Sequence, residues 1–338
     1  LMLFGLMVQA NVYAASTAEI PANHQPKKPS YITANASKVL APALAAVGSP
    51  VVRVYQDFVP WFGEGRDQAT LLALGMELGN NYFVHPLSDL AAGIPEDTTV
   101  VLITSNSFGL LESASAENDP VAQANLDAFV QAGGSLIVDM GDYLGDTGGF
   151  IAPGAQGTPN GFGPSPCSDA TLATTAFGGD GTIGTSDDHP IVKGPDGIAG
   201  TGDDLNNSNI DMDPSSCDVA AGNLIDGITL PGNATILMEA TFGGIQKPIL
   251  AEYPYGSGKI ILDTLTKEFG GHKPIGFGPS FFMLNLFHYA LQLPPPTPPA
   301  NDDFDNAIPI AEPLPFANAQ NTYFPTTAND DPDCFGNA

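Results

Sequence analysis

Two apolar strands joined by one amphipathic helix, near the middle of the chain, most constrain its fold. The run TTVVLITSN (Thr98–Asn106) is typical of a buried strand, and VAQANLDAFVQAGG (Val121–Gly134) has apolar residues at helical intervals before a final Gly-Gly. This helix leads directly into a second apolar strand, SLIVDMGD (Ser135–Asp142). The order predicts a βαβ unit, and the continuous apolar runs predict a parallel sheet that is covered on both faces.

The same alternation continues on both sides of this unit. Further strands are expected at Val51–Phe58, Asn81–Leu87, Ala234–Ala240, Lys247–Tyr255 and Lys259–Thr266, and further helices at Arg66–Gly79 and Pro279–Leu293. We therefore expect one α/β domain over residues 49–293. Its predicted architecture has three layers around a doubly wound, mostly parallel sheet.

A segment of different composition interrupts this domain. Residues 145–223 are crowded with Gly, Pro, Asp, Asn and Thr, which predicts a long, ordered-loop insertion. Cys167 and Cys217 flank its Gly/Asp-rich part and would close it as a disulfide in an oxidising compartment. The sequence leaves open whether that bond forms, and Cys334 has no evident partner.

The insertion contains a near-repeat with the pattern Asp-Gly-x-x-Gly-Thr-x-Asp-Asp. It occurs at Asp180–Asp188 and again at Asp196–Asp204, sixteen positions later (196 − 180). Calcium prefers carboxylate, amide and carbonyl oxygens on a flexible Gly-containing loop, and crowded carboxylates repel one another without a cation. The candidate calcium ligands are Asp180, Asp187, Asp188, Asp196, Asp203 and Asp204. The EF-hand pattern is absent, and the alternative reading is a solvated acidic turn repeat.

The formal charge narrows the classes of partner. There are 37 acidic against 10 basic residues, giving −27. Nucleic acids and anionic membranes are bound through clustered Lys and Arg, so the charge argues against both. It is compatible with cations, with cationic polymers, or simply with solubility.

The ends of the chain suggest an exported, multidomain protein. Residues 1–15 form an apolar run with a small-residue cleavage pattern near Ala14, which predicts a signal peptide without its basic n-region; a buried N-terminal helix is the alternative. The run is too short to span a bilayer, so no membrane insertion is expected after cleavage. Residues 16–48 read as a linker or N-terminal arm and 294–302 as a proline-rich linker. We expect a secreted or cell-surface fragment of a longer protein.

The domain resembles the class I glutamine amidotransferase-like fold, in its non-catalytic, secreted bacterial form. The resemblance rests on the Gly-Gly helix end before a strand, on His189-Pro190-Ile191, and on the hairpin KPILAEYPYGSGKIIL. It implies a flavodoxin/amidotransferase-like sheet. The tail from Asn301, which opens with NDDFDNAIPI, resembles the opening of a bacterial pre-peptidase C-terminal β-sandwich domain, expected over residues 303–338.

The catalytic residues of the amidotransferases do not carry over. The family places a cysteine nucleophile in the turn after the strand that is Ser135–Met140 here, where this chain has Gly141-Asp142-Tyr143. The family's His-x-Glu pair would follow the last strand, where this chain has Lys267-Glu268-Phe269-Gly270-Gly271-His272. Without a thiolate and its base, the covalent route of these enzymes is closed.

We therefore expect a non-catalytic binding or structural module that is stabilised by calcium, with carbohydrate or another protein domain as its partner. The alternative is a secreted hydrolase of glycans or peptides. Its activity would reside in a downstream domain, or here with His85, Asp142 and His272 as weak catalytic candidates beside Ser105 or Ser107. No Gly-x-Ser-x-Gly elbow accompanies them.

Overall fold

The computed structural model describes residues 50–57, 66–104, 119–140, 152–157, 167–207, 209–210, 219–220, 225–265 and 281–296. All of these residues belong to one compact unit, residues 40–338. The expected signal segment, the arm that follows it and the β-sandwich start at 303–338 lie outside the described residues. No described helix has both the length and the apolar character that crossing a membrane requires.

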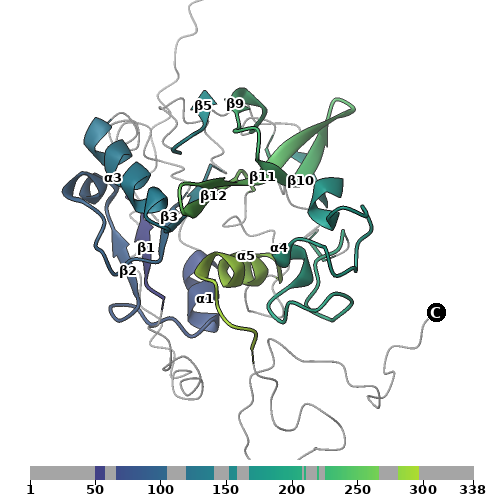
Figure 1. The fold of residues 1–338 in the computed structure, drawn as a ribbon, viewed down its shortest axis with the longest axis horizontal. Coiled ribbons are helices and arrows are strands. Elements are labelled where there is room, and N and C mark those ends of the chain that lie inside the picture. The colour runs from purple at the N-terminus through teal and green to yellow at the C-terminus, as the bar shows by residue number, and fades with distance from the viewer. Residues whose placement is uncertain are drawn as a thin grey trace, which may run out of the picture. The chain divides into compact units, whose positions relative to one another are not determined.

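An eight-stranded sheet forms the centre of the unit, in the order β2-β1-β3-β4-β12-β11-β10-β7 (Figure 1). Neighbouring strands are parallel from β2 to β12 and antiparallel from β12 to β7. The strands are β1 (Val52–Tyr55), β2 (Tyr82–His85), β3 (Val100–Ile103), β4 (Ser135–Asp139), β7 (Ala170–Leu172), β10 (Thr235–Phe242), β11 (Ile245–Tyr255) and β12 (Gly258–Asp263). The expected α/β class with a mostly parallel central sheet is confirmed, and the architecture is consistent with a flavodoxin/amidotransferase-like three-layer fold.

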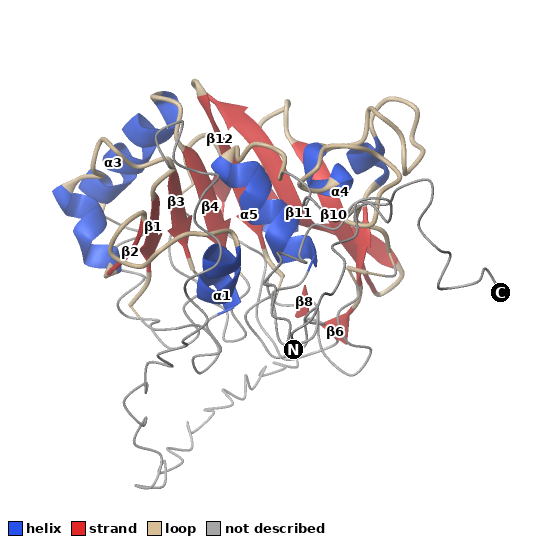
Figure 2. Cartoon of the chain, turned by 90° about the horizontal axis from the view of Figure 1, so that it is seen from below, coloured by secondary structure: helices blue, strands red, loops and turns tan. Residues whose placement is uncertain are grey.

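Helices cover both faces of the sheet. One face packs against α1 (Arg66–Ala73) and α5 (Phe281–Leu291), the other against α3 (Pro120–Gln131) and the 3-10 helix η2 (Leu87–Ala92) (Figure 2). The strands supply both cores because their side chains alternate between the faces. On β3, Val100 and Leu102 join the α1/α5 side, whereas Val101 and Ile103 join the α3 side.

Local sequence signals explain where the helices begin and end. Asp119 caps α3, since its carboxylate accepts hydrogen bonds from the backbone N–H groups of Val121 and Ala122. The helix stops before Gly133, which adopts φ 115°. Helix α1 was expected to reach Gly79 but ends at Ala73, because Gly75 already adopts a left-handed φ of 81°.

The insertion is more regular than its composition predicts. It contributes the edge strand β7 to the main sheet, since Leu172, Thr171 and Ala170 pair with β10. Its other elements are β5 (Gln156–Gly157), β6 (Cys167–Ser168), the 3-10 helix η3 (Thr174–Phe177), α4 (Pro190–Lys193) and β8 (Val219–Ala220); η4 (Ile225–Gly227) and β9 (Ile228–Thr229) follow it. Strands β5 and β9 pair with each other, as do β6 and β8.

Apolar residues of the insertion hold it against the domain. Ile191, Val192, Leu205 and Ile210 are buried in the same core cluster as α5. Full burial of side chains of this size stabilises by about 1.5–3 kcal/mol each. The acidic segment is therefore a docked part of the fold.

Candidate functional site

The near-repeat of the insertion forms two loops, which we call the first loop (Asp180–Asp188) and the second loop (Asp196–Asp204). In the first loop Asp187 organises the backbone. Its Oδ2 accepts the N–H groups of Gly179 and Asp180 at 2.7 and 3.2 Å, and its Oδ1 accepts the Thr185 hydroxyl at 2.8 Å. Asp180 accepts the N–H of Thr182 at 2.7 Å in a local turn.

The second loop repeats this arrangement sixteen positions later. Asp203 Oδ2 accepts the N–H of Asp196 at 3.1 Å, and its Oδ1 accepts the Thr201 hydroxyl at 2.7 Å. Asp196 accepts the N–H of Ile198 at 2.7 Å. The repeated sequence therefore encodes a repeated hydrogen-bond pattern in which carboxylates order the chain around them.

Glycine is required where each loop passes its organising aspartate. Gly178 and Gly194 adopt φ of 64° and 70°. A Cβ on Gly178 would lie 2.3 Å from the Asp187 carbonyl oxygen, and one on Gly194 would lie 2.6 Å from that of Asp203. Both the φ value and the close backbone approach exclude a larger side chain.

The last aspartate of each loop also accepts backbone N–H groups. Asp188 Oδ2 accepts those of Gly184 and Thr185 at 2.7 and 3.1 Å, and Asp204 Oδ2 accepts that of Gly200 at 2.6 Å. The residue Asp188 is only 2% exposed, and its Oδ1 is buried without a hydrogen-bond partner among the described residues. A buried carboxylate oxygen in that state is expected to attract water or a cation.

Equivalent aspartates of the two loops have different environments. Asp187 is exposed, and the Thr185 hydroxyl with the neighbouring N–H groups lowers the pKa of its carboxyl. Asp203 is buried at 4% exposure. Burial raises the pKa of Asp204, and repulsion from Asp203 and Asp196 adds to that effect although Gly200 and Thr201 oppose it. The second loop therefore concentrates negative charge inside the packed structure.

Asn285 of α5 anchors α4 and the second loop. Its side-chain Nδ2 donates to the carbonyl oxygen of Ile191 at 3.0 Å and to that of Asp203 at 2.9 Å, and the residue is 2% exposed. One donor group thus holds α4 and the second loop on the same helix. Buried hydrogen bonds of this kind are costly to break because the carbonyls would stay unpaired.

A second contact joins the insertion to the sheet. His189 Nε2 lies 2.8 Å from Glu252 Oε1 on β11, and the Tyr289 hydroxyl donates to the same oxygen at 3.2 Å. His189 Nδ1 accepts the N–H of Ile191 at 3.2 Å and so caps α4. Because Nδ1 is an acceptor, the proton of the neutral ring resides on Nε2 and is donated to Glu252.

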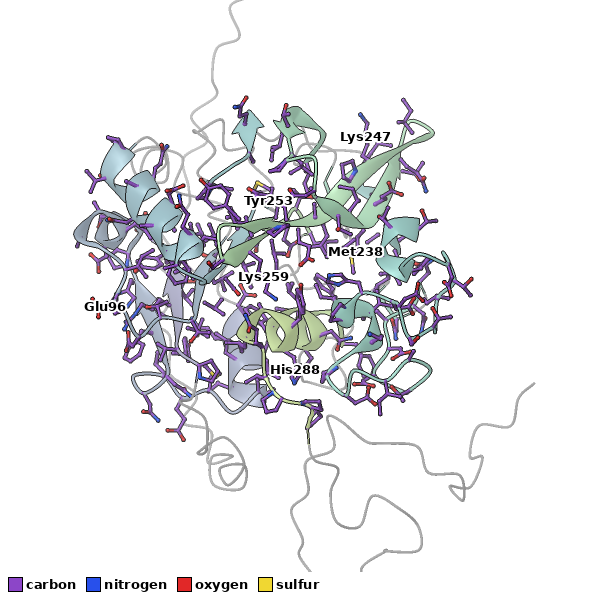
Figure 3. The ribbon with its side chains drawn as sticks, viewed as in Figure 1. Glu96, Met238, Lys247, Tyr253, Lys259 and His288 are labelled. Atoms are coloured by element: carbon purple, nitrogen blue, oxygen red, sulfur yellow. The ribbon has the colours of Figure 1, made fainter. Side chains whose placement is uncertain are left out.

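Lys259 of β12 completes this polar group. Its ammonium lies 3.3 Å from the ring centroid of Tyr289 and donates to the Tyr289 carbonyl oxygen, so it reaches from the sheet towards α5 (Figure 3). Burial lowers the pKa of Lys259, whereas Glu252 opposes that shift. Burial alone would raise the pKa of Glu252, but the hydrogen bonds and charges of His189, Tyr289 and Lys259 bring it below its usual value.

The sequence analysis named His189 only within the His189-Pro190-Ile191 motif and missed the partners of its side chain. Glu252 interrupts the apolar run of β11, and Lys259 begins the apolar run of β12. A charged residue facing a core is the signal that would have identified them. Their pairing with residues far along the chain has no local signature.

The six predicted metal ligands lie in the two loops, three in each. Within the described part of the chain, no group of three or more His, Cys, Asp or Glu side chains is arranged to hold a metal ion. Each carboxylate of the two loops accepts at least one hydrogen bond from the loop itself. Calcium therefore stays a prediction, and its binding would have to use the remaining oxygens.

Of the three weak catalytic candidates, His85 is the one that lies among the described residues. His85 ends β2, where its ring stacks on Tyr55 with centroids 5.4 Å apart. Its Nε2 lies 3.2 Å from Arg53 Nη1 and its Nδ1 lies 3.5 Å from the Asp89 carboxylate. Asp142, His272, Ser105, Ser107 and the Gly141–Tyr143 turn lie outside the described residues, as does Cys217 of the predicted disulfide.

No family model matches the sequence, and no curated protein matches it. Among solved structures, a β-galactosidase from Bacillus circulans sp. alkalophilus is similar over 73% of this chain and 32% of its own, with 11% identity and a TM-score of 0.42. A cytoplasmic protein from Salmonella typhimurium is similar over 72% and 98%, with 12% identity and a TM-score of 0.38. A putative ThuA-like protein from Bacteroides uniformis is similar over 75% and 95%, with 11% identity and a TM-score of 0.37. The chain spans about a third of the length of the β-galactosidase.

Proposed function

We propose that this unit is a non-catalytic binding or structural module of an exported protein, of the amidotransferase-like type. We further propose that calcium stabilises the first and second loops, which together we call the tandem loops. The observation that carries the proposal is the charge crowding of the second loop. There burial, together with repulsion from Asp203 and Asp196, raises the pKa of Asp204. A divalent cation would relieve that repulsion.

The donor set of the loops fits calcium. Each loop offers carboxylate oxygens, a threonine hydroxyl and backbone carbonyls, which are the oxygen ligands that calcium takes. The buried Oδ1 of Asp188, which lacks a partner among the described residues, supplies an oxygen that the loop does not use itself. Calcium would supply charge neutralisation and rigidity there, and the protein would supply the surface that contacts its partner.

The non-catalytic reading draws support from the sequence and from the contacts of His85. A Gly-Asp-Tyr turn stands where the resembling enzymes have their nucleophile, at Gly141–Tyr143. Both ring nitrogens of His85 already have partners, in Arg53 and Asp89. The alternative of a secreted hydrolase acting through His85, Asp142 and His272, or through a downstream domain, is separated from this proposal by measuring turnover.

Titration calorimetry and thermal unfolding test the calcium part. The full chain is freed of metal with EDTA and titrated with CaCl2, with MgCl2 as the control ion. We expect binding at millimolar concentration or tighter and a higher Tm in calcium. The double variant Asp180→Asn and Asp196→Asn should lose most of that gain, because each amide still accepts the turn hydrogen bond but removes a charge. Absence of heat and of a Tm shift at millimolar calcium would overturn the proposal.

A turnover panel and a glycan array test the function itself. The chain is incubated with ester, peptide and glycan substrates, and binding is measured on immobilised glycans and protein domains. A binding module shows retention without turnover. Turnover that disappears in a folded His272→Ala variant would establish the hydrolase instead.

A further inference from the structure

A groove opens at the edge of the sheet where β3 and β4 begin. Its volume is about 610 Å³, and it lies between the loop that precedes β3 and the carboxyl end of α3. Glu96, Thr98 and Thr99 come from the loop, and Asn125, Phe129 and Gly134 come from α3 and the turn after it. Such a volume is within the range of ligand-binding clefts. The second loop contacts α5 through Asp203, and His189, between the two loops, contacts β11, so this surface is separate from the site described above.

Two side chains of the groove, Glu96 and Asn125, offer hydrogen-bond acceptors, whereas the hydroxyls of Thr98 and Thr99 can also donate. Glu96 is exposed and carries a carboxylate. The Nδ2 of Asn125 already donates hydrogen bonds to the carbonyl oxygens of Leu90 and Ala91, at 2.7 and 3.4 Å. Its Oδ1 is therefore the group that can accept a hydrogen bond from a ligand. A ligand rich in N–H donors would complement this lining.

The electrostatics of the groove also favour a cation. Helix α3 ends at Gln131, and the carboxyl end of a helix carries partial negative charge. None of the lining residues is basic. The nearby guanidinium of Arg53 is neutralised by Asp97, at 2.8 Å, and donates through Nε to Thr98. The charge of Glu96, at the outer edge of the unit (Figure 3), is thus left to act on the groove.

An aromatic side chain supplies an apolar wall. The ring of Phe129 lies against Gly134 so closely that a Cβ there would be 2.2 Å from Cζ. The ring is only half-buried, so part of it faces the groove. An aromatic surface beside a carboxylate is a setting in which guanidinium groups bind, because they stack on rings and donate several planar hydrogen bonds.

We propose that this groove is a docking site for a basic segment of a partner protein, with an arginine side chain seated between Glu96 and Phe129. The strongly negative chain, at −27, would attract such a segment over a longer range. The inference concerns the partner and does not depend on calcium in the tandem loops.

The test uses a matched pair of ligands on the full chain. N-acetyl-arginine amide and N-acetyl-citrulline amide have nearly the same shape, but only the first is charged. Chemical-shift changes of backbone amides are followed by NMR, with calcium absent and at two salt concentrations. We expect the arginine derivative alone to move the signals of Asn125, Ala128 and Thr98, and to bind more weakly in high salt.

Variants connect the binding to the groove. Glu96→Gln should weaken binding of the arginine derivative by up to about fivefold, the upper end for one exposed charge pair, and Phe129→Leu should weaken it as well. Glu77→Gln, an exposed carboxylate elsewhere, is the matched control and should change nothing. The proposal is overturned if both ligands behave alike, if neither shifts these signals, if the shifts occur only in the tandem loops, or if Glu96→Gln binds like the parent.

Discussion

The imidazole Nε2 of His189 lies 2.8 Å from Glu252 Oε1, and this contact ties the insertion to the central sheet across 63 residues of sequence. Both side chains are largely buried, at 12% and 16% exposure. The same histidine caps α4 through its other ring nitrogen. One side chain therefore fixes the start of a helix and its docking on the sheet.

Replacing Glu252 should reduce stability in a pH-dependent way. Glu252→Gln keeps the size but weakens the acceptor for His189 and Tyr289, so we expect a loss of about 1–3 kcal/mol at pH 7 by urea unfolding. Because the folded pKa of Glu252 is below its usual value, its contribution is present above the unfolded pKa and is lost as the pH falls through the folded pKa. Parent and variant should therefore converge in acid. A constant difference from pH 7 to pH 3 would contradict the assignment.

Substitution of two glycines, Gly194 just before the second loop and Gly197 within it, distinguishes backbone strain from steric conflict. Gly194 and Gly197 both adopt φ 70°, but a Cβ on Gly197 meets nothing within 4 Å, whereas one on Gly194 meets Asp203. Gly197→Ala should cost about 1 kcal/mol, from the left-handed conformation alone. Gly194→Ala should cost clearly more, measured by the same denaturant titration. Equal losses would show that the loop relaxes around the new methyl group.

Asn285 should be among the most sensitive positions on α5. Asn285→Asp removes the donor that binds Ile191 and Asp203 and places a carboxylate against two carbonyl oxygens. We expect a loss of at least about 3 kcal/mol, from two unpaired carbonyls and a buried charge. Limited proteolysis should then cut within the tandem loops first. Asn233→Asp, at an exposed position, is the control and should leave both stability and cleavage unchanged.

The effect of Asp204 on stability should depend on both the pH and the presence of calcium. Its raised pKa means that the ionised form is disfavoured in the fold, so its destabilising effect appears as the pH rises through that pKa. Asp204→Asn should therefore raise Tm at pH 7 in EDTA, and this gain should shrink as the pH falls through the folded pKa and the parent becomes protonated. In calcium the order should reverse, since the variant loses a ligand charge. A variant that is less stable than the parent in EDTA would show that the charge is well accommodated.

Local patterns in the sequence were sufficient for much of the architecture. The apolar runs at β3, β4 and β12 and the periodicity of α3 and α5 identified the βαβ core, because burial on one or both faces leaves a repeating trace in sequence. The two acidic loops were also visible, since turns with left-handed φ demand glycine at fixed offsets. The positions of Asp180 and Asp196, at the start of the two loops, follow from the same repeat.

Tertiary packing determined the features that local sequence patterns do not predict. The repeat makes Asp187 and Asp203 equivalent in sequence, yet only Asp203 is buried, and Asn285 of α5 binds its carbonyl oxygen. The partners of His189 and the addition of β7 to the sheet depend on contacts between residues far apart in the chain. Such contacts depend on the whole fold, and no short stretch of sequence records them.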